Sequence, residues 1–154
     1  MLHKCHVIVG GENLIDRVQK KSIKGNSESV DSLGGSPYNV AVALARQKDI
    51  HIITLCHGPG TLMSAKIDSE FIFNGYEIAL FPDSVDKQTP IIGYLPGHMP
   101  FKLGEKLKEL GMHIINKKAD DTCHIDRNLI TGASPYASNK LGRLAAEILL
   151  KVVN

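Results

Sequence analysis

The chain has 154 residues, a length that suits one domain with an apolar core of its own. Apolar residues make up 43% of the sequence and charged residues 22%, which are ordinary globular values and exclude a disordered chain. The net charge is +2 and the lysines are scattered, so neither nucleic acid nor a membrane surface is expected as a partner.

The apolar runs and the cysteine count indicate a cytoplasmic protein. The longest apolar runs, at 6–10 and 49–55, are of strand length and far shorter than the run of about 20 residues that a membrane helix needs. The N-terminus shows neither the apolar core nor the cleavage site of a signal peptide. Three cysteines are an odd number, which argues against a disulfide framework and favours free thiols in a reducing compartment.

The first residues predict a strand followed by a small hairpin. Residues 6–10 form a continuous β-branched run ended by glycines, which is typical of a buried strand. The polar stretch that follows, near 13–33, is interrupted by two short apolar segments around Leu14–Val18 and Ser29–Leu33. We expect these two segments to pair as a β hairpin inserted after the first strand.

The middle of the chain predicts a helix, a strand and a second helix. Ser36 is a good N-cap and Pro37 occupies the first helical position, where its missing N–H costs nothing. Residues 49–55 are the next buried strand. A Gly-Pro-Gly sequence directly after Cys56 and His57 begins the second helix.

The second half continues the alternation of strands and helices. Strands are predicted at 76–81 and 112–116, on either side of an amphipathic helix at 101–111. Residues 121–132 predict two short strands around a turn at Asp126–Asn128.

The last helix has the clearest pattern in the chain. Apolar residues recur at helical spacing on one side, with basic residues on the other. The apolar positions are Leu141, Leu144, Ala145, Ile148, Leu149 and Val152. Together the elements predict a single α/β domain over 1–154, in which a mainly parallel sheet is flanked by helices in three layers. We expect a flavodoxin-like or Rossmann-like arrangement, with the hairpin near 13–33 as an insertion.

Each of the three cysteines, Cys5, Cys56 and Cys123, is followed at once by a histidine. Zinc sites usually show clustered ligand pairs, whereas these pairs are far apart in the sequence. Adjacent residues of a strand also point to opposite faces, so such a pair within a strand cannot hold one ion with both side chains. We therefore predict no metal site, and interpret the first and third pairs as ordinary strand residues.

The pair Cys56-His57 differs because it lies between an apolar strand and a helix start. A sharp strand-to-helix turn lifts a side chain at the carboxyl edge of the sheet, where α/β folds bind ligands. The amide groups of the following helix favour thiolate, so we expect a lowered pKa and a nucleophilic sulfur. A backbone N–H such as that of Gly58 could bind an oxyanion. The alternative is a structural cysteine that caps a tight turn.

Residues 50–154 resemble the C-terminal half of the HchA-type branch of PfpI-like proteins, in the class I glutamine-amidotransferase-like superfamily. The likeness rests on "ITLCHGPGTLMSAK", on "FNGYEIALFPDSVDKQTPIIGYLPGHMPFKLGEKLKELGMHIIN" and on "HIDRNLITGASPYASNKLGRLAAEILL". Members of this branch are described as glyoxalase III, as protein deglycases and as heat-shock holding chaperones. The resemblance implies a stress-response enzyme, a lyase or hydrolase that needs no cofactor.

The resemblance also implies roles for individual residues. Cys56 would be the nucleophile, His57 the general acid and base, and Asp86 the carboxylate that orients His57. Asp83, three residues earlier, competes with Asp86 for that role. The implied substrates are a small 2-oxoaldehyde such as methylglyoxal, converted to a hydroxy acid, or glycated groups on protein or nucleotide. A thiolate that adds to the aldehyde and an imidazole that moves the proton between two carbons would perform this chemistry.

Residues 6–48 resemble a different family, the N-terminal part of PfkB-type sugar kinases. The likeness rests on "VIVGGENLIDRV" and "GGSPYNVAVALARQ". It implies sugar contacts by Asp16, Gly34, Gly35 and Asn39, but the kinase's anion hole, catalytic base and ATP pocket have no counterpart. We therefore predict a chimera joined near residues 48–52, with a sugar-kinase-like segment at 1–48 and a deglycase-like segment at 49–154.

The deglycase resemblance lacks its upstream half. Family members carry there a protonated glutamate beside the cysteine and a metal site of two histidines and one glutamate, and neither can be placed in this sequence. Glu12 follows the first strand, and we interpret it as a solvated turn residue. Activity is therefore expected to be weak or lost. The alternatives are an inert scaffold or holding chaperone, and a sugar-binding fragment of a kinase, and the resemblance implies a homodimer.

Overall fold

The structure is a computed structural model, and it describes residues 7–9, 14–21, 27–34, 51–67, 70–93 and 97–153. The predicted helix after Ser36 and the pair Cys5-His6 lie outside these residues, as does Glu12.

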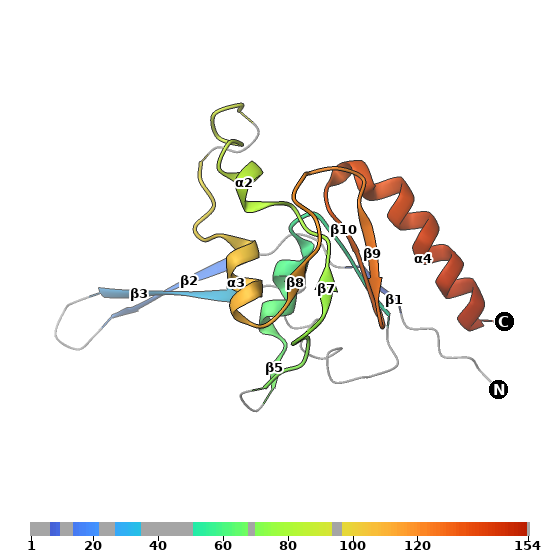
Figure 1. Cartoon of the computed structure of the whole chain (residues 1–154). Helices are drawn as coiled ribbons and strands as arrows, with labels where there is room; N and C mark the ends of the chain where they lie inside the picture. Colours follow the sequence, from blue (N-terminus) through green and yellow to red (C-terminus); the bar gives the residue numbers. More distant parts are fainter. Residues whose placement is uncertain are drawn as a thin grey trace.

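A four-stranded sheet in the order β1-β4-β10-β9 forms the centre of the fold (Figure 1). Its strands are β1 (Val7–Val9), β4 (His51–Leu55), β9 (Cys123–Asp126) and β10 (Leu129–Gly132). Both β1 and β10 run parallel to β4, while β9 is antiparallel to β10. The expectation of a mainly parallel sheet is thus confirmed, with an antiparallel strand at one edge.

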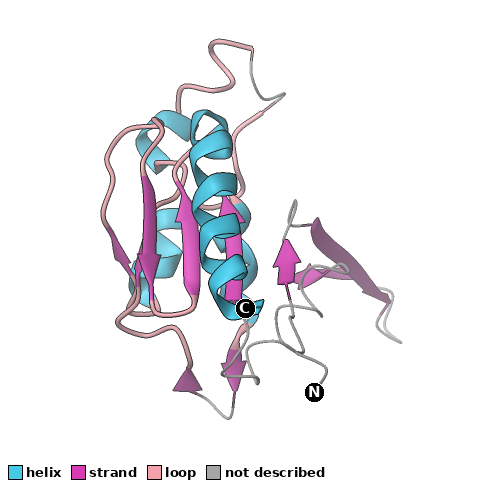
Figure 2. Ribbon diagram, turned by 90° about the vertical axis from the view of Figure 1, so that its right-hand side faces the viewer, coloured by secondary structure: helices cyan, strands magenta, loops and turns pink. Residues whose placement is uncertain are grey.

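Helices lie on both faces of this sheet (Figure 2). The long helix α4 (Ser138–Val153) covers one face, and the predicted terminal helix is confirmed. The other face is covered by the 3-10 helix η1 (Gly58–Ser64) and by α3 (Leu103–Glu109). The chain is therefore a mixed α/β protein, as the alternation of patterns predicts.

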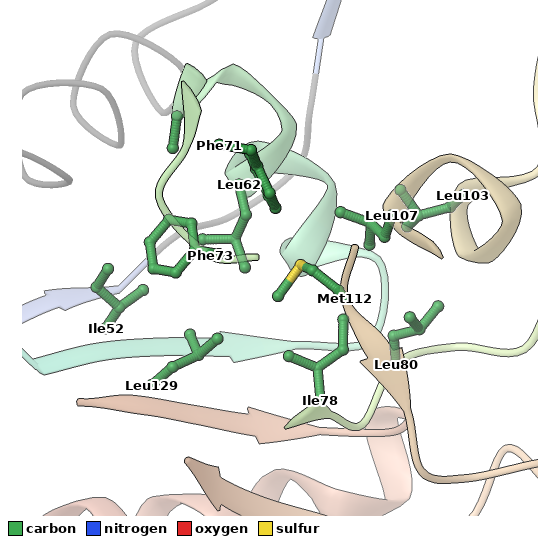
Figure 3. Close-up of a cluster of buried hydrophobic side chains, with 11 residues drawn as sticks. Ile52, Leu62, Phe71, Phe73, Ile78, Leu80, Leu103, Leu107, Met112 and Leu129 are labelled. Atoms are coloured by element: carbon green, nitrogen blue, oxygen red, sulfur yellow. The ribbon is translucent and has the colours of Figure 1, made fainter. Parts of the chain in front are cut away.

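The side chains of the central strands alternate between the two faces, because successive strand residues point in opposite directions. Ile53 and Ile130 join a cluster with residues of α4. Their neighbours Ile52 and Leu129 join a larger cluster with Leu62 of η1 and residues of α3 (Figure 3). The two clusters hold the helices on the sheet, and they fix η1, which directly follows Cys56 and His57.

The predicted hairpin near 13–33 is present as β2 (Leu14–Lys21) and β3 (Ser27–Gly34), paired antiparallel along their full length. A second, very short hairpin joins β5 (Lys66–Ile67) to β6 (Glu70–Phe71) and was not predicted.

The prediction of a strand over 76–81 is wrong for the residues after Ile78. Only β7 (Glu77–Ile78) is a strand, and it pairs in parallel with β8 (His113–Ile114), a shortened form of the strand predicted at 112–116. At Ala79 and Leu80 the backbone N–H groups donate to side chains and not to a neighbouring strand. The Ala79 N–H donates to Thr131 Oγ1 (2.8 Å). An apolar run predicts burial here, but not the source of the hydrogen bonds.

Asn116 completes this replacement at the next residue. Its Oδ1 accepts from the Leu80 N–H (3.0 Å), and its Nδ2 donates to the Leu80 carbonyl (2.9 Å). The Phe81 N–H then donates to the Cys56 carbonyl (3.0 Å). The segment is thereby held beside the end of β4 without forming a ladder of its own.

Two short helices flank the regular elements and were not predicted. The single turn α2 (Asp83–Asp86) follows Pro82, and the 3-10 helix η2 (Pro135–Ala137) leads into α4. The predicted stop of α3 is confirmed, since Gly111 has a φ of +93° in the left-handed region that favours glycine. No helix among the described residues is long and apolar enough to cross a membrane.

Candidate active site

Cys56 lies on a sharp turn at the carboxyl end of β4. Its φ is +61°, a left-handed conformation that costs an ordinary residue about 1–2 kcal/mol. Two backbone hydrogen bonds hold it there: the Cys56 N–H donates to the Gly132 carbonyl (2.8 Å), and the Cys56 carbonyl accepts from the Phe81 N–H (3.0 Å). The half-buried thiol is thus presented at the edge of the sheet by neighbouring segments on both sides.

The helix after Cys56 and His57 is a 3-10 helix, not the α-helix that the sequence predicts. The Gly60 N–H donates to the His57 carbonyl (2.9 Å), a bond spanning three residues. The hydroxyl of Thr61 reaches back over the same interval to the Gly58 carbonyl (2.8 Å), which reinforces the tighter winding. Gly58 is buried at the first position of η1, and its role as an oxyanion donor stays a prediction.

Cys56, His57 and Asp86 form one chain of contacts. Cys56 Sγ lies 3.3 Å from His57 Nδ1. On the other side of the ring, His57 Nε2 lies 2.9 Å from Asp86 Oδ1 and 3.0 Å from Oδ2. The Phe81 ring packs on the imidazole, with 4.8 Å between ring centroids. The imidazole is therefore held between a sulfur and a carboxylate, which is the arrangement of a nucleophile, a base and an orienting acid.

Burial and pairing act in opposite directions on His57. Burial lowers its pKa, but hydrogen bonds to Asp86 and Cys56, together with the negative charges of both, outweigh burial and raise the pKa from 6.5 to about 10. The side chain of Asp86 is only 8% exposed, so its charge is little screened by water. At neutral pH the ring is consequently an imidazolium that lies next to the Cys56 sulfur.

Asp83, the alternative partner of His57, contacts a different element. Its Oδ1 accepts from the Gly104 N–H (2.8 Å) and its Oδ2 accepts from the Glu105 N–H (3.0 Å), both at the start of α3. Of the two aspartates, Asp86 is the one that reaches the imidazole. The sequence analysis did not predict the helical turn that makes the two side chains point in different directions. A proline followed by acidic residues is nevertheless a known signal for the start of a helix.

The pair Cys123-His124 has no such geometry. Cys123 Sγ lies 3.8 Å from the Ala137 carbonyl, and burial raises the pKa of this thiol. His124 Nε2 instead lies 3.2 Å from Glu77 Oε2. The two side chains therefore have separate partners, as expected for adjacent residues of a strand.

Metal-ligating side chains do not cluster among the residues that the structure describes. Among them, no group of three or more histidine, cysteine, aspartate or glutamate side chains comes close enough together to hold a metal ion. A cavity of about 50 Å³ lies beside the site, and its lining residues are Asp83, Asp86, Lys87, Met99, Phe101 and Lys102.

Comparison with known proteins relates the chain to deglycases. No family model matches it. Over 123 residues it is 47% identical to the protein/nucleic acid deglycase HchA of Escherichia coli O6:H1 and 46% identical to protein/nucleic acid deglycase 1 of strain K12. The match covers 77% of this chain and 43% of each relative, so the chain spans less than half the length of these relatives. The chain is homologous to deglycases of the HchA type over that stretch.

The matched stretch is longer than the deglycase-like segment inferred from the sequence. It takes in 77% of the 154 residues, which is more than residues 50–154 contain. Part of the match therefore lies before residue 50.

Solved structures support the mixed α/β fold. One crystal structure has a TM-score of 0.64 at 26% identity, covering 76% of this chain and 52% of that chain. The Rapid Encystment Protein 24 kDa of Francisella tularensis has a TM-score of 0.61 at 18% identity, over 75% of this chain and 51% of that one. Glyoxalase III of Candida albicans has a TM-score of 0.51 at 16% identity, over 72% and 49%.

Proposed function

We propose that this chain carries a cysteine-dependent site of the glyoxalase III and deglycase kind. Cys56 is the nucleophile, His57 the general acid and base, and Asp86 the carboxylate that orients the ring. The substrate is a 2-oxoaldehyde such as methylglyoxal, or a glycated group on protein or nucleotide. The observation that supports this proposal best is the continuous contact from the Cys56 sulfur through His57 to Asp86.

The first step is attack of the Cys56 thiolate on the aldehyde carbon, which forms a C–S bond and moves an electron pair onto the oxygen. The His57 imidazolium, 3.3 Å from the sulfur, gives its proton to that oxygen and completes a hemithioacetal. The backbone N–H of Gly58 is the proposed second donor to this oxygen.

The second step uses the change in charge that the first step produces. Bond formation removes the thiolate, whose charge and hydrogen bond help to raise the pKa of His57, so the neutral ring becomes a base. His57 then takes the proton from the former aldehyde carbon and returns it to the neighbouring carbon, while the hydroxyl proton on the former aldehyde carbon passes to the neighbouring ketone oxygen, giving a thioester of a 2-hydroxy acid. Hydrolysis by one water releases the hydroxy acid and the free thiol.

Turnover of methylglyoxal tests the proposal. The wild-type chain should form lactate at a measurable rate, because Cys56, His57 and Asp86 are in contact. Cys56→Ser should abolish this turnover, while Cys123→Ser should leave it unchanged, since Cys123 contacts Ala137 and not the site. Equal rates in Cys56→Ser and the wild type would contradict the proposal.

Labelling with iodoacetamide separates a reactive thiol from an inert scaffold in the same samples. Cys56 should react near neutral pH much faster than Cys123, because an imidazolium lies beside Cys56 whereas burial raises the pKa of Cys123. Equal labelling of all the cysteines would favour the scaffold.

A holding chaperone is the second candidate. The observation that favours it is the exposure of two neighbouring apolar side chains, Ile91 (82%) and Ile92 (72%), shortly after α2. Large apolar groups exposed together are typical of surfaces that bind other chains.

We further propose a chimeric origin and a single α/β domain over 1–154. The motif "VIVGGENLIDRV" is the part of the kinase resemblance that lies upstream of the deglycase match, and because that match reaches before residue 50 we propose a join upstream of residues 48–52. We infer a flavodoxin-like, three-layer arrangement, a cytoplasmic location and a homodimer.

A further inference from the structure

Asp83 takes no part in the chain of contacts at Cys56, yet it lies one helical turn from the residue that does. The single turn α2 begins at Asp83 and ends at Asp86, which contacts His57. Both carboxylates therefore project from the same turn of helix, one toward α3 and the other toward the imidazole. Anything that moves the first end of this turn also moves the second.

The carboxylate of Asp83 supplies the N-terminal cap of α3. The residue at the cap position of that helix, Lys102, makes no side-chain cap of its own. Asp83 instead accepts from the Gly104 N–H (2.8 Å) and from the Glu105 N–H (3.0 Å), two of the donors that a helix leaves unpaired at its start. These bonds join α2 to α3 by a charged acceptor, which is stronger than a neutral one.

The helix α3, which Asp83 contacts, is itself anchored in the hydrophobic core. Leu103 and Leu107 are 3% and 0% exposed, and they belong to the same core cluster as Leu62 of η1. Because η1 directly follows His57, the same core cluster anchors both residues of the His57–Asp86 contact. The His57 ring is attached through η1, and the Asp86 carboxylate through α2, Asp83 and α3.

We propose that Asp83 is a positioning residue of the candidate active site, which holds α2 on α3 and thereby keeps the Asp86 carboxylate on His57. This inference rests on the proposed function for its consequence in catalysis. The contact itself is geometric, and the space around it is limited. A Cβ on Gly104 would lie 2.7 Å from Asp83 Oδ2 and 3.1 Å from Ile114 Cδ1, so a larger residue displaces the carboxylate.

Two variants disturb the contact from opposite sides. Asp83→Asn keeps the shape of the side chain but leaves one acceptor oxygen for two N–H donors. Gly104→Ala keeps the negative charge of Asp83 and moves it, so an effect shared by both variants comes from position and not from charge. Asp120→Asn is the matched control, because Asp120 also accepts from a backbone N–H, that of Thr122 (3.0 Å), two residues further along its own loop.

The measurement is an NMR titration of the His57 ring, together with the rate at which iodoacetamide labels Cys56 and the melting temperature of each variant. Both disturbing variants should lower the pKa of His57 and slow the labelling of Cys56 several-fold or more, since a misplacement of about 1 Å can cost about a hundredfold in rate. Asp120→Asn should change neither quantity, even if it lowers the melting temperature.

The inference is overturned if Asp83→Asn and Gly104→Ala lose stability while His57 titrates and Cys56 reacts as in the wild type. In that case Asp83 only stabilises α3. If one variant does not fold, the other still decides the question, since each disturbs the same contact. A wild type without methylglyoxal turnover, in which the variants still shift the titration of His57, would support the positioning role and reject the proposed reaction.

Discussion

His57 lies between a thiol and a carboxylate, and this position decides its protonation state. Burial alone would lower the pKa of the ring, but the contacts with Asp86 and Cys56 raise it from 6.5 to about 10. A group that binds its proton more tightly in the folded chain stabilises the fold wherever it is protonated. The ring that is proposed for catalysis thus also contributes to stability.

The resulting stability depends on pH in a defined direction. Below about pH 6.5 both folded and unfolded chains carry the proton, and the contribution of His57 is fully present. It falls between about pH 6.5 and 10 and is lost above that range, because the folded chain then gives up its proton as well. Urea unfolding of the wild type and His57→Gln should show a difference in free energy of unfolding that shrinks as the pH rises.

A control variant separates this effect from general alkaline destabilisation. His124→Gln removes an imidazole that contacts Glu77, a residue whose side chain is 54% exposed. The difference between wild type and His57→Gln should shrink more over the range than that for His124→Gln. A difference that is constant, or that grows with pH, would show that the paired imidazolium does not stabilise the fold.

Part of the geometry of the Cys56 site can be predicted from the sequence. Gly-Pro-Gly after an apolar strand predicts the sharp turn, and Cys56 has the left-handed φ that such a turn requires. The pairing of His57 with Asp86 could not be derived this way, because the two residues are 29 positions apart. Only the resemblance to a known family favoured Asp86 over Asp83, and the reason for the choice lies in the direction of α2.

Among the helices and strands, the sequence predicts best those whose own apolar pattern matches their burial in the fold. The strand β4 and the helix α4 are clear in the sequence, since β4 is a short β-branched run buried on both faces and the apolar residues of α4 recur at helical spacing. The segment after β7 is different, because its hydrogen bonds come from Thr131 and Asn116. Such partners are set by the tertiary fold, so an apolar run was mistaken for a strand.

Asn116 should consequently be important for stability. Replacing it by Ala removes both hydrogen bonds to Leu80, a residue with 0% exposure, and leaves a buried N–H and carbonyl without these partners. An unpaired buried polar group costs about 1–3 kcal/mol, so the free energy of unfolding should fall by about that amount or more. Urea unfolding measures it, with Asn139→Ala on the exposed side of α4 as the control.

The loss should also reach the site, because the Phe81 N–H donates to the Cys56 carbonyl directly after the segment that Asn116 holds. Slower labelling of Cys56 in folded Asn116→Ala would support this link. A variant as stable as Asn139→Ala would contradict the view that side chains replace a strand ladder here.

At the scale of the whole molecule, the distribution of apolar surface raises the question of what the chain binds. Among the residues whose burial the structure describes, most large buried apolar side chains are divided between the two clusters that hold helices on the sheet. Ile91 and Ile92 belong to neither cluster, and they lie only a few residues after Asp86. Exposing these side chains to water is unfavourable in free energy, and a bound apolar partner would remove that penalty.

Suppression of aggregation tests whether this surface acts as a holding site. In the presence of the wild-type chain, a heat-denatured client enzyme should scatter less light than alone, and the double variant Ile91→Ser, Ile92→Ser should protect it several-fold less. Tyr136→Ser is the matched control, because Tyr136 is 80% exposed but precedes α4. Since neither isoleucine contacts Cys56, His57 or Asp86 in the interactions described, lactate formation should persist in the double variant. Equal protection by the double variant and the wild type would leave the thiol site as the only function supported by this structure.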